Sequence, residues 1–420
     1  MTPSQDASRS IAVGRVRAAL ALVVVAQWLG TSLWFSPAGA ADGLMARLAI
    51  GTAAFGWLIA ATQLGFIAGT IAFAATGTAD RFAASRIFTV SCIVGATANA
   101  ALVFPGVDFA SAWALRLIVG LALAGIYPLG MKMIVQWVGG RPAAALGWLV
   151  GMLTLGTAMP HAVRASGATW PWEAVVLASS ALAVIGAAVV YFLGDGPHGS
   201  ATAAGASGAA ASGFSARRVF AIPGFRASAL GYFGHMWELY AFWSVLPWLC
   251  QPIAAELARR HGSLSTPSVA FMSFAVIAIG SIGCIAGGQW SRRVGSARVA
   301  ALALAGSGAM CLAYPLIAEQ ALGLRIAALL LWGLCVVADS PQFSALSARF
   351  APPQWLGSAL VLQNGIGFLI TVVSIVIMSR ALPAWGASAM WILAPGPLLG
   401  LWALRPLLHR AARDRAEGSA

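Results

Sequence analysis

Two ionisable side chains stand three residues apart inside an apolar stretch of the chain. His235 and Glu238 belong to the segment GYFGHMWELYAFW, in an apolar run predicted to span residues 226–249. A spacing of three places both side chains on one face of a helix, where they can touch. His235 would lie about 13 Å into the run, near the middle of a bilayer core of about 30 Å. A carboxyl–imidazole pair at that depth can hold or release a proton near neutral pH; a hydrogen-bonded pair that locks two helices is the alternative.

A second apolar run, residues 111–137, carries two cations. They are Arg116 and Lys132, the only lysine of the chain. They are separated by about 4.4 helical turns and point about 160° apart, so both cannot face one cavity squarely. The planar fork of Arg116 can hold a carboxylate by two hydrogen bonds, and we expect it to be the partner of an anionic substrate. Lys132 is expected to be a substrate-binding cation that lines the cavity. For each cation the alternative is a structural role, in which the long side chain reaches to the lipid headgroups.

Three more polar side chains lie in apolar runs of the second half. Asp339 precedes Ser340-Pro341 in the run 322–346. It is expected either to act in conformational gating or to form a structural salt bridge with Arg292, Arg293 or Arg349. Gln363 and Asn364 lie in the middle of the run 355–379 and are candidates for substrate contact or for hydrogen bonds between helices. Two nitrogen or oxygen ligands are too few for a metal site, so we expect no metal and no cofactor.

Two charged loops repeat in the two halves of the chain. The first, Thr78–Arg86, reads TADRFAASR and contains Asp80, Arg81 and Arg86 between two apolar runs. The second, Gly287–Arg298, reads GGQWSRRVGSAR. Its closing arginine, Arg298, follows Arg86 by about half of the 420-residue chain. A duplicated charged loop in an apolar protein indicates two copies of one membrane unit.

These loops resemble the signature of the major facilitator superfamily of secondary transporters, roughly Gly-x-x-x-Asp-Arg-x-Gly-x-x-Arg. The first loop keeps the acid and both arginines, and the second keeps Gly295 and Arg298. Arg116-x-x-x-Gly120 is similar to the arginine motif of the family's fourth helix, which is often tied to proton coupling. The fifth apolar run resembles the glycine-proline motif of the antiporters but separates Gly156 from Pro160.

The resemblance implies an all-α integral membrane protein with twelve transmembrane helices in two parallel six-helix bundles. It places the substrate site between the halves near the middle of the membrane. It also implies that the charged loops control the conformational change. The residues we assign to gating are Asp80, Arg81, Arg86, Arg298 and Asp339.

Composition agrees with a membrane protein. The chain is 60% hydrophobic and 9% charged, against about 25% charged residues in soluble domains. Its net charge of +13 reflects arginines in cytoplasmic loops and not a nucleic-acid partner. With twelve spans and both termini inside, 17 basic residues face the cytoplasm and six face outward. The five cysteines lie in or beside apolar runs without a CxxC pair and are expected to be packing residues.

A Gly/Ser/Ala-rich stretch divides the chain. We predict a cytoplasmic tail, a six-helix bundle, a cytoplasmic linker, a second six-helix bundle and a cytoplasmic tail. Their bounds are 1–17, 18–193, 194–225, 226–408 and 409–420. The first apolar run is longer than a signal-peptide core and is expected to be an uncleaved helix.

The sequence therefore predicts a monomeric, proton-coupled transporter of a small organic anion in a bacterial-type inner membrane. An efflux antiporter for lipophilic compounds is the alternative, and a receptor or scaffold that transports nothing is a third possibility. No HExxH or GxSxG motif is present, so we do not expect an enzyme. The expected partners are a small-molecule substrate, protons and lipid, and no nucleic acid.

Overall fold

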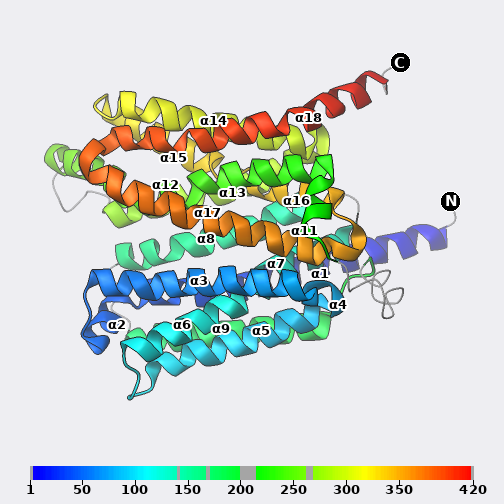
Figure 1. Ribbon diagram of the computed structural model, residues 1–420, viewed down its shortest axis with the longest axis horizontal. Helices are drawn as coiled ribbons and strands as arrows, with labels where there is room; N and C mark the ends of the chain where they lie inside the picture. The colour runs from blue at the N-terminus through cyan, green and yellow to red at the C-terminus, as the bar shows by residue number, and fades with distance from the viewer. Residues whose placement is uncertain (1–2, 140–141, 167–170, 199–213, 262–267, 418–420) are drawn as a thin grey trace. The chain divides into compact units, whose positions relative to one another are not determined.

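The computed structural model describes residues 3–139, 142–166, 171–198, 214–261 and 268–417 (Figure 1). In this part of the chain every regular element is a helix. The helices up to residue 193 are α1 (Pro3–Gly39), α2 (Ala41–Leu48), α3 (Thr52–Thr76), α4 (Thr78–Arg81), α5 (Ala84–Ala100), η1 (Ala101–Val103), α6 (Phe109–Ala124), α7 (Tyr127–Val138), α8 (Ala143–Ser166) and α9 (Trp172–Leu193). The later helices are α11 (Ala216–Ala221), α12 (Pro223–His261), α13 (Val269–Val294), α14 (Ser296–Ile317), α15 (Leu322–Cys335), α16 (Ser340–Phe350), η4 (Pro353–Trp355), α17 (Leu356–Trp385), η5 (Gly386–Leu393) and α18 (Pro395–Glu417).

Ten helical segments of the described residues are long and apolar enough to cross a bilayer. One of them, Pro353–His409, contains α17 and the first part of α18. The 39-residue helix α12 is not among the ten, and it is the helix that carries His235 and Glu238. The chain is thus a multi-pass helical membrane protein, whereas the count of twelve spans stays a prediction.

The helices pack as two compact units. The first consists of Met1–Ala145, Pro171–Ser215 and Pro352–Leu362. The second consists of Leu146–Trp170, Ala216–Ala351 and Gln363–Ala420. Most of α8 therefore belongs to the second unit, and the first residues of α17 belong to the first. Residues 199–213 of the predicted linker lie outside the described residues, and α11 forms within its last part.

The predicted runs 111–137 and 322–346 are each interrupted at the same relative point. The first run divides between α6 and α7, and the second divides between α15 and α16. A proline stands in the first turn after each break, Pro128 in α7 and Pro341 in α16. Proline has no backbone N–H and is tolerated where a helix begins, so each break falls directly before it. The second break places the backbone of Asp339 between two helices.

Glycines allow the closest helix contacts in each unit. A Cβ atom added to Gly65 of α3 would lie 2.1 Å from the carbonyl oxygen of Leu117 in α6, and one on Gly120 would lie 2.1 Å from that of Thr62. In the second unit, a Cβ atom on Gly333 of α15 would lie 2.0 Å from the carbonyl oxygen of Val276 in α13. Backbones that approach this closely gain packing contacts where lipid removes the hydrophobic drive for association.

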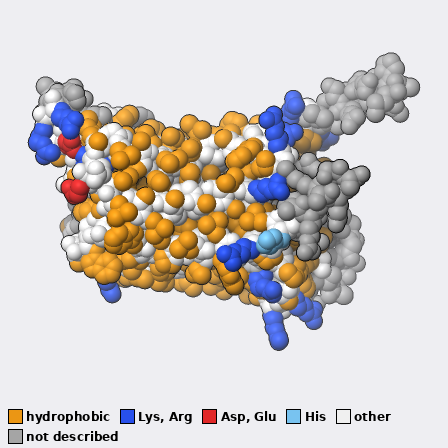
Figure 2. All heavy atoms as spheres, turned by 90° about the horizontal axis from the view of Figure 1, so that it is seen from above, with side chains coloured by type: hydrophobic (Ala, Val, Ile, Leu, Met, Phe, Trp, Pro, Cys, Tyr) orange, Lys and Arg blue, Asp and Glu red, His pale blue; other side chains and the backbone are white. Residues whose placement is uncertain are grey.

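The exposed surface has the composition of a lipid-facing protein. On the face shown in Figure 2, hydrophobic side chains cover the middle, and charged side chains gather towards the two ends. Large apolar residues that are more than half exposed include Trp57, Val90, Phe192 and Leu316. Such exposure is unusual for a soluble protein and is expected where acyl chains replace water.

Candidate functional site

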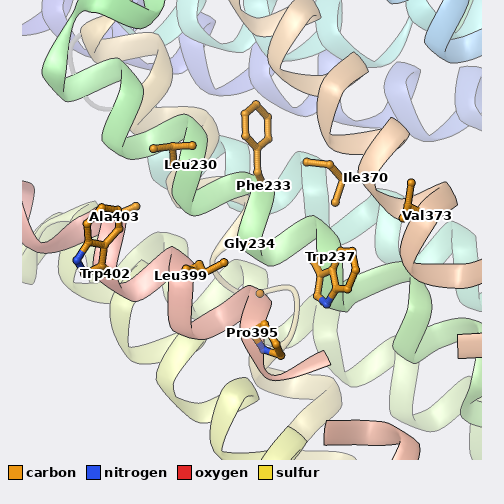
Figure 3. A pocket seen from close by; sticks show the side chains of 11 residues that line it. Leu230, Phe233, Gly234, Trp237, Ile370, Val373, Pro395, Leu399, Trp402 and Ala403 are labelled. Atoms are coloured by element: carbon orange, nitrogen blue, oxygen red, sulfur yellow. The ribbon is translucent and has the colours of Figure 1, made fainter. Parts of the chain in front are cut away.

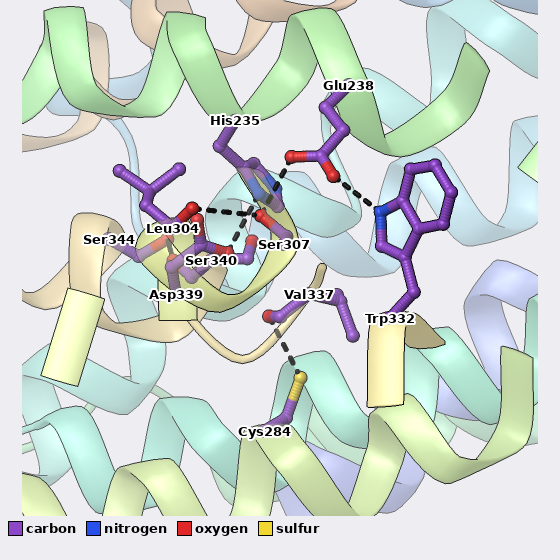
Figure 4. A network of polar contacts seen from close by, with 10 residues as sticks. All are labelled: His235, Glu238, Cys284, Leu304, Ser307, Trp332, Val337, Asp339, Ser340 and Ser344. Carbon is purple, nitrogen blue, oxygen red and sulfur yellow. Dashed lines mark hydrogen bonds and ion pairs between the residues drawn. The ribbon is translucent and has the colours of Figure 1, made fainter. Parts of the chain in front are cut away.

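Glu238 lies in a buried polar cluster inside the second unit (Figure 4). Its carboxylate accepts hydrogen bonds from three neutral donors, none of them on α12. Ser307 Oγ lies 2.8 Å from Oε2, Trp332 Nε1 lies 2.6 Å from Oε1, and Cys311 Sγ lies 3.3 Å from Oε1. The side chain is 1% exposed. A buried carboxylate is costly, and these three donors offset part of that cost.

Packing on neighbouring helices holds the donors in place. Ser307 and Cys311 are four residues apart and therefore lie on one face of α14. The indole of Trp332, on α15, stacks on Phe242 with ring centroids 4.3 Å apart. Phe242 is four residues after Glu238 on α12, so one helix supplies both the carboxylate and the ring that stacks on its nearest donor.

His235 pairs with Asp339. Its Nδ1 atom lies 2.8 Å from Oδ1 of Asp339, and both side chains are 1% exposed. The sequence predicted instead that His235 touches Glu238, and that Arg292, Arg293 or Arg349 neutralises Asp339. The break between α15 and α16 is the reason for the difference, because it directs Asp339 towards α12. Nε2 of His235 has no hydrogen-bond partner among the described residues.

Arg116 is buried inside the first unit with its guanidinium on neutral acceptors. Nε donates to Thr62 Oγ1 at 3.0 Å and Nη1 donates to Asn99 Oδ1 at 2.9 Å. Nη2 lies 3.1 Å from the carbonyl oxygen of Leu33 and 3.4 Å from that of Trp34. The side chain is 0% exposed, so it does not reach to headgroups. It links α6 to α1, α3 and α5.

Asn99 is the centre of this network, and the sequence analysis missed it. Its Oδ1 accepts from Arg116 and from Ser36 Oγ, the latter at 2.8 Å. Its Nδ2 donates to the carbonyl oxygen of Val176 and to Ser180 Oγ, both at 3.0 Å. An amide inside an apolar run was a signal that could have identified Asn99. No comparable local signal marks Trp332, Ser307 or Cys311, which are ordinary residues of apolar helices.

The loop residue Asp80 lies at the start of α17 within the first unit. Its Oδ1 accepts from the backbone N–H of Gly357 at 2.7 Å, and its Oδ2 from that of Ser358 at 3.0 Å. Lys132 Nζ lies 3.8 Å from Oδ1 of Asp80 and donates to the carbonyl oxygen of Ala79 at 2.5 Å. The carboxylate thereby satisfies two free N–H groups and complements the positive end of the helix dipole. Lys132 is 5% exposed and reaches this loop and not the headgroups.

The other charged residues of the loops differ in their exposure. Arg81 and Arg86 are exposed, and Arg298 is half-buried in the first turn of α14. Asp195, which the sequence analysis did not select, accepts from the backbone N–H groups of Ala84 and Ser85 at 3.0 and 2.7 Å. It caps the start of α5 as Asp80 caps the start of α17.

The amides of α16 and α17 are buried. Asn364 Oδ1 accepts from the hydroxyl group of Tyr232 at 3.1 Å. Gln363 is 1% exposed and its Oε1 has no hydrogen-bond partner among the described residues. Gln342 of α16 is 0% exposed, and neither Nε2 nor Oε1 of its side chain has a hydrogen-bond partner among the described residues. Unsatisfied buried amides are rare because they cost free energy, and a ligand is one way to satisfy them.

No group of three or more metal-binding side chains occurs within the described residues. The candidate side chains of the second unit are acids, an imidazole and amides, and the cations Arg116 and Lys132 belong to the first unit. These groups can exchange protons and form hydrogen bonds.

The family model described as Major Facilitator Superfamily matches residues 20–375. No curated protein matches the sequence. Three solved structures are similar to the chain in fold. The proton:xylose symporter XylE is 11% identical with a TM-score of 0.72, and the match covers 93% of this chain and 95% of that one. The human organic anion transporter MFSD10 is 17% identical with a TM-score of 0.68, covering 93% and 99%. The E. coli fucose:proton symporter FucP is 16% identical with a TM-score of 0.64, covering 92% and 97%.

Proposed function

Because the chain belongs to the Major Facilitator Superfamily, it is a membrane transporter and not an enzyme, and we propose that it couples the movement of a small organic solute to protons. The observation that carries this proposal is the buried cluster around Glu238. Ionisable groups inside a membrane are rare and are usually functional, and among the described residues this carboxylate has only neutral hydrogen-bond donors.

Glu238 is the proposed proton carrier. When ionised, it accepts from Ser307, Cys311 and Trp332; when protonated, it donates one hydrogen bond and loses the charge that requires those donors. Alternating access would expose it to each side of the membrane in turn, so that it loses the proton on one side and regains it on the other. His235, one turn before Glu238 on α12, and Asp339, which precedes α16, form the proposed second ionisable element.

The solute is proposed to be polar. The side-chain amide of Gln342 and Oε1 of Gln363, which lack partners among the described residues, supply donors and acceptors for it. Asn364, next to Gln363, is a further proposed contact. An anion is the proposed charge type, because no carboxylate contacts Arg116 among its described partners and its charge is uncompensated there. Lys132 is the second proposed cation of the substrate path, although its nearest acid is Asp80.

The proposed orientation places both termini in the cytoplasm of a bacterial-type cell, with the protein in the inner membrane as a monomer. The excess of arginine in the loops assigned to that side supports this orientation. The proposed architecture is twelve transmembrane helices in two six-helix bundles with the domain bounds predicted from the sequence. Asp80, Arg81, Arg86, Arg298 and Asp339 remain the proposed gating residues.

Purified protein in liposomes loaded with a pH-sensitive dye tests the function. Sugars, mono- and dicarboxylates and lipophilic cations are added in turn, and the proton flux that each drives is recorded. We expect the addition of a carboxylate to drive proton flux through the wild-type protein. Glu238→Gln is expected to abolish accumulation driven by a pH gradient while it preserves exchange of labelled solute. Glu319→Gln, which removes an exposed carboxyl group, is the matched control.

Two outcomes would contradict the proposal. Normal coupling in Glu238→Gln would show that the carboxyl group does not carry the proton. If lipophilic cations drive the largest proton flux, the substrate is a drug-like compound and not an organic anion. Efflux would then describe the function better.

A further inference from the structure

An apolar groove lies on the surface of the second unit, between α12, α17 and α18 (Figure 3). Its volume is about 530 Å³. It is lined by Leu230, Phe233, Gly234, Trp237, Ile370, Val373, Pro395, Gly396, Leu399, Trp402 and Ala403. Several of these are well exposed, Leu399 at 64%, Trp402 at 61% and Val373 at 49%. The groove is therefore open to the surroundings of the protein.

The lining is almost entirely apolar. Its two side-chain N–H groups are the indoles of Trp237 and Trp402 (Figure 3), and Nε1 of Trp237 already donates to the carbonyl oxygen of Ile392 at 2.9 Å. Glycines form the floor, because a Cβ atom on Gly234 would lie 2.3 Å from the carbonyl oxygen of Gly396. The lining therefore favours a hydrocarbon occupant in this region.

Two arginines stand at one end of the groove. Gly234 lies against Gly396, and Gly231 lies against Gly400, so α12 and α18 run in opposite directions. The same register places Arg226 of α12 opposite Arg405 of α18. Arg226 comes one turn before Leu230, and Arg405 comes two residues after Ala403.

The charge of these arginines is unpaired in the described part of the chain. Both side chains are exposed, and neither forms a salt bridge with a described residue. Arg226 donates from Nη1 to the carbonyl oxygen of Phe220 at 3.3 Å, which leaves most of its fork available. A pair of guanidinium groups is well suited to bind phosphate oxygens.

The groove has the length of an acyl chain within one leaflet. From Leu230 to Trp237, and from Pro395 to Ala403, each helix rises about 10–12 Å. One leaflet of the hydrocarbon core is about 15 Å deep. We propose that the groove holds an acyl chain of an anionic phospholipid whose phosphate group binds Arg226 and Arg405.

Native mass spectrometry of the detergent-purified protein tests this proposal. Dioleoyl phosphatidylglycerol and dioleoyl phosphatidylcholine are titrated separately, so that only the headgroup differs. We expect the first phosphatidylglycerol to bind about tenfold more tightly, because two cations act on the anionic headgroup. The double variant Arg226→Gln/Arg405→Gln is expected to remove this preference. Arg292→Gln/Arg293→Gln, two exposed arginines at the end of α13, is the control and should keep it.

Two further measurements distinguish binding of the acyl chain from binding of the lipid headgroup. Leu230→Trp, at a residue that is 42% exposed, should fill the groove and weaken the binding of both lipids without disturbing the core. Glycerol phosphate, which has the headgroup chemistry without acyl chains, should not displace phosphatidylglycerol at equal concentration. Thermal unfolding of each variant checks that it is folded, and Arg405→Lys, which retains the charge, should preserve most of the preference.

The proposal would be overturned by equal binding of the two lipids to the wild-type protein. An equal loss in the α13 control would assign the effect to overall charge, and full displacement by glycerol phosphate would indicate a site for free phosphate. Unchanged binding in Leu230→Trp would show that the groove is not occupied. All these readouts are independent of transport.

Discussion

The Nδ1 atom of His235 lies 2.8 Å from Oδ1 of Asp339, and Asp339 is the residue that directly precedes α16. The pair joins the long helix α12 to the break between α15 and α16. Three residues further along α12, Glu238 makes a separate set of contacts with α14 and α15. The helix α12 thus contacts the break before α16 through His235, and α14 and α15 through Glu238.

The His235–Asp339 pair is expected to stabilise the second unit. Asp339→Asn should lower the free energy of unfolding by about 3 kcal/mol, because it removes one partner of a buried pair and leaves the other uncompensated. The double variant His235→Gln/Asp339→Asn should cost less than the sum of the single changes. Thermal unfolding in detergent measures both, with the exposed Asp42→Asn as control. Additive effects would mean that the two side chains do not interact.

Trp332 is expected to set the pH range of transport. Trp332→Phe removes the indole N–H that lies 2.6 Å from Glu238 but can keep the stacking on Phe242. Its loss should shift the pH midpoint of proton flux, because the carboxylate loses one of its three hydrogen bonds. Phe242→Leu, which weakens the stacking but retains the donor, should move it less. An unchanged midpoint in Trp332→Phe would contradict the role.

The contact between Asp80 and α17 is expected to control the conformational change. Asp80→Asn should leave the protein folded but slow turnover and favour the inward-open state, since the neutral amide no longer complements the helix dipole. Transport rates and the accessibility of single cysteines on the two sides measure this. Transport at the wild-type rate would limit the loop to a role in topology.

Gly357 tests the same contact by steric means. An added Cβ atom would lie 2.6 Å from both the carbonyl oxygen of Ala79 and Oδ1 of Asp80, so Gly357→Ala should separate the loop from α17. It should therefore reproduce the effect of Asp80→Asn on turnover. Gly323→Ala is the control, because no heavy atom lies within 4 Å of its Cβ position. A normal rate in Gly357→Ala would show that the close approach is not required.

Arg116 is expected to be both a structural and a substrate-selecting residue. Arg116→Lys keeps the charge but cannot reach the acceptors on Thr62, Asn99 and Leu33 together, so the thermal unfolding midpoint should fall. Thr62→Val removes one acceptor and keeps the guanidinium. If Arg116 selects anions, only Arg116→Lys should raise the KM for a carboxylate more than that for a neutral sugar. Equal changes in the two variants would leave Arg116 with a structural role alone.

Much of this protein was predictable from short-range patterns. Runs of about 20 apolar residues indicate membrane helices because the thickness of the bilayer sets their length. Repetition of a charged loop around Asp80 and Arg298 indicated the family. Burial of His235, Glu238 and Arg116 followed from their positions within apolar runs. These properties depend on residues that are neighbours in the chain. Each apolar run partitions into the lipid according to its own hydropathy, whatever the other runs contain.

Partners across helices were not predictable in this way. His235 was expected to contact Glu238 three residues away, yet its acid is Asp339, more than 100 residues later in the chain. The pairing depends on a helix break before Ser340, whereas the hydropathy of the run 322–346 is continuous. Likewise, the donors to Glu238 are supplied by α14 and α15, whose residues there look like ordinary apolar packing. Hydropathy reports how a side chain partitions between water and lipid. The identity of its hydrogen-bond partner depends on the rotation and register of packed helices, which exist only after the helices associate.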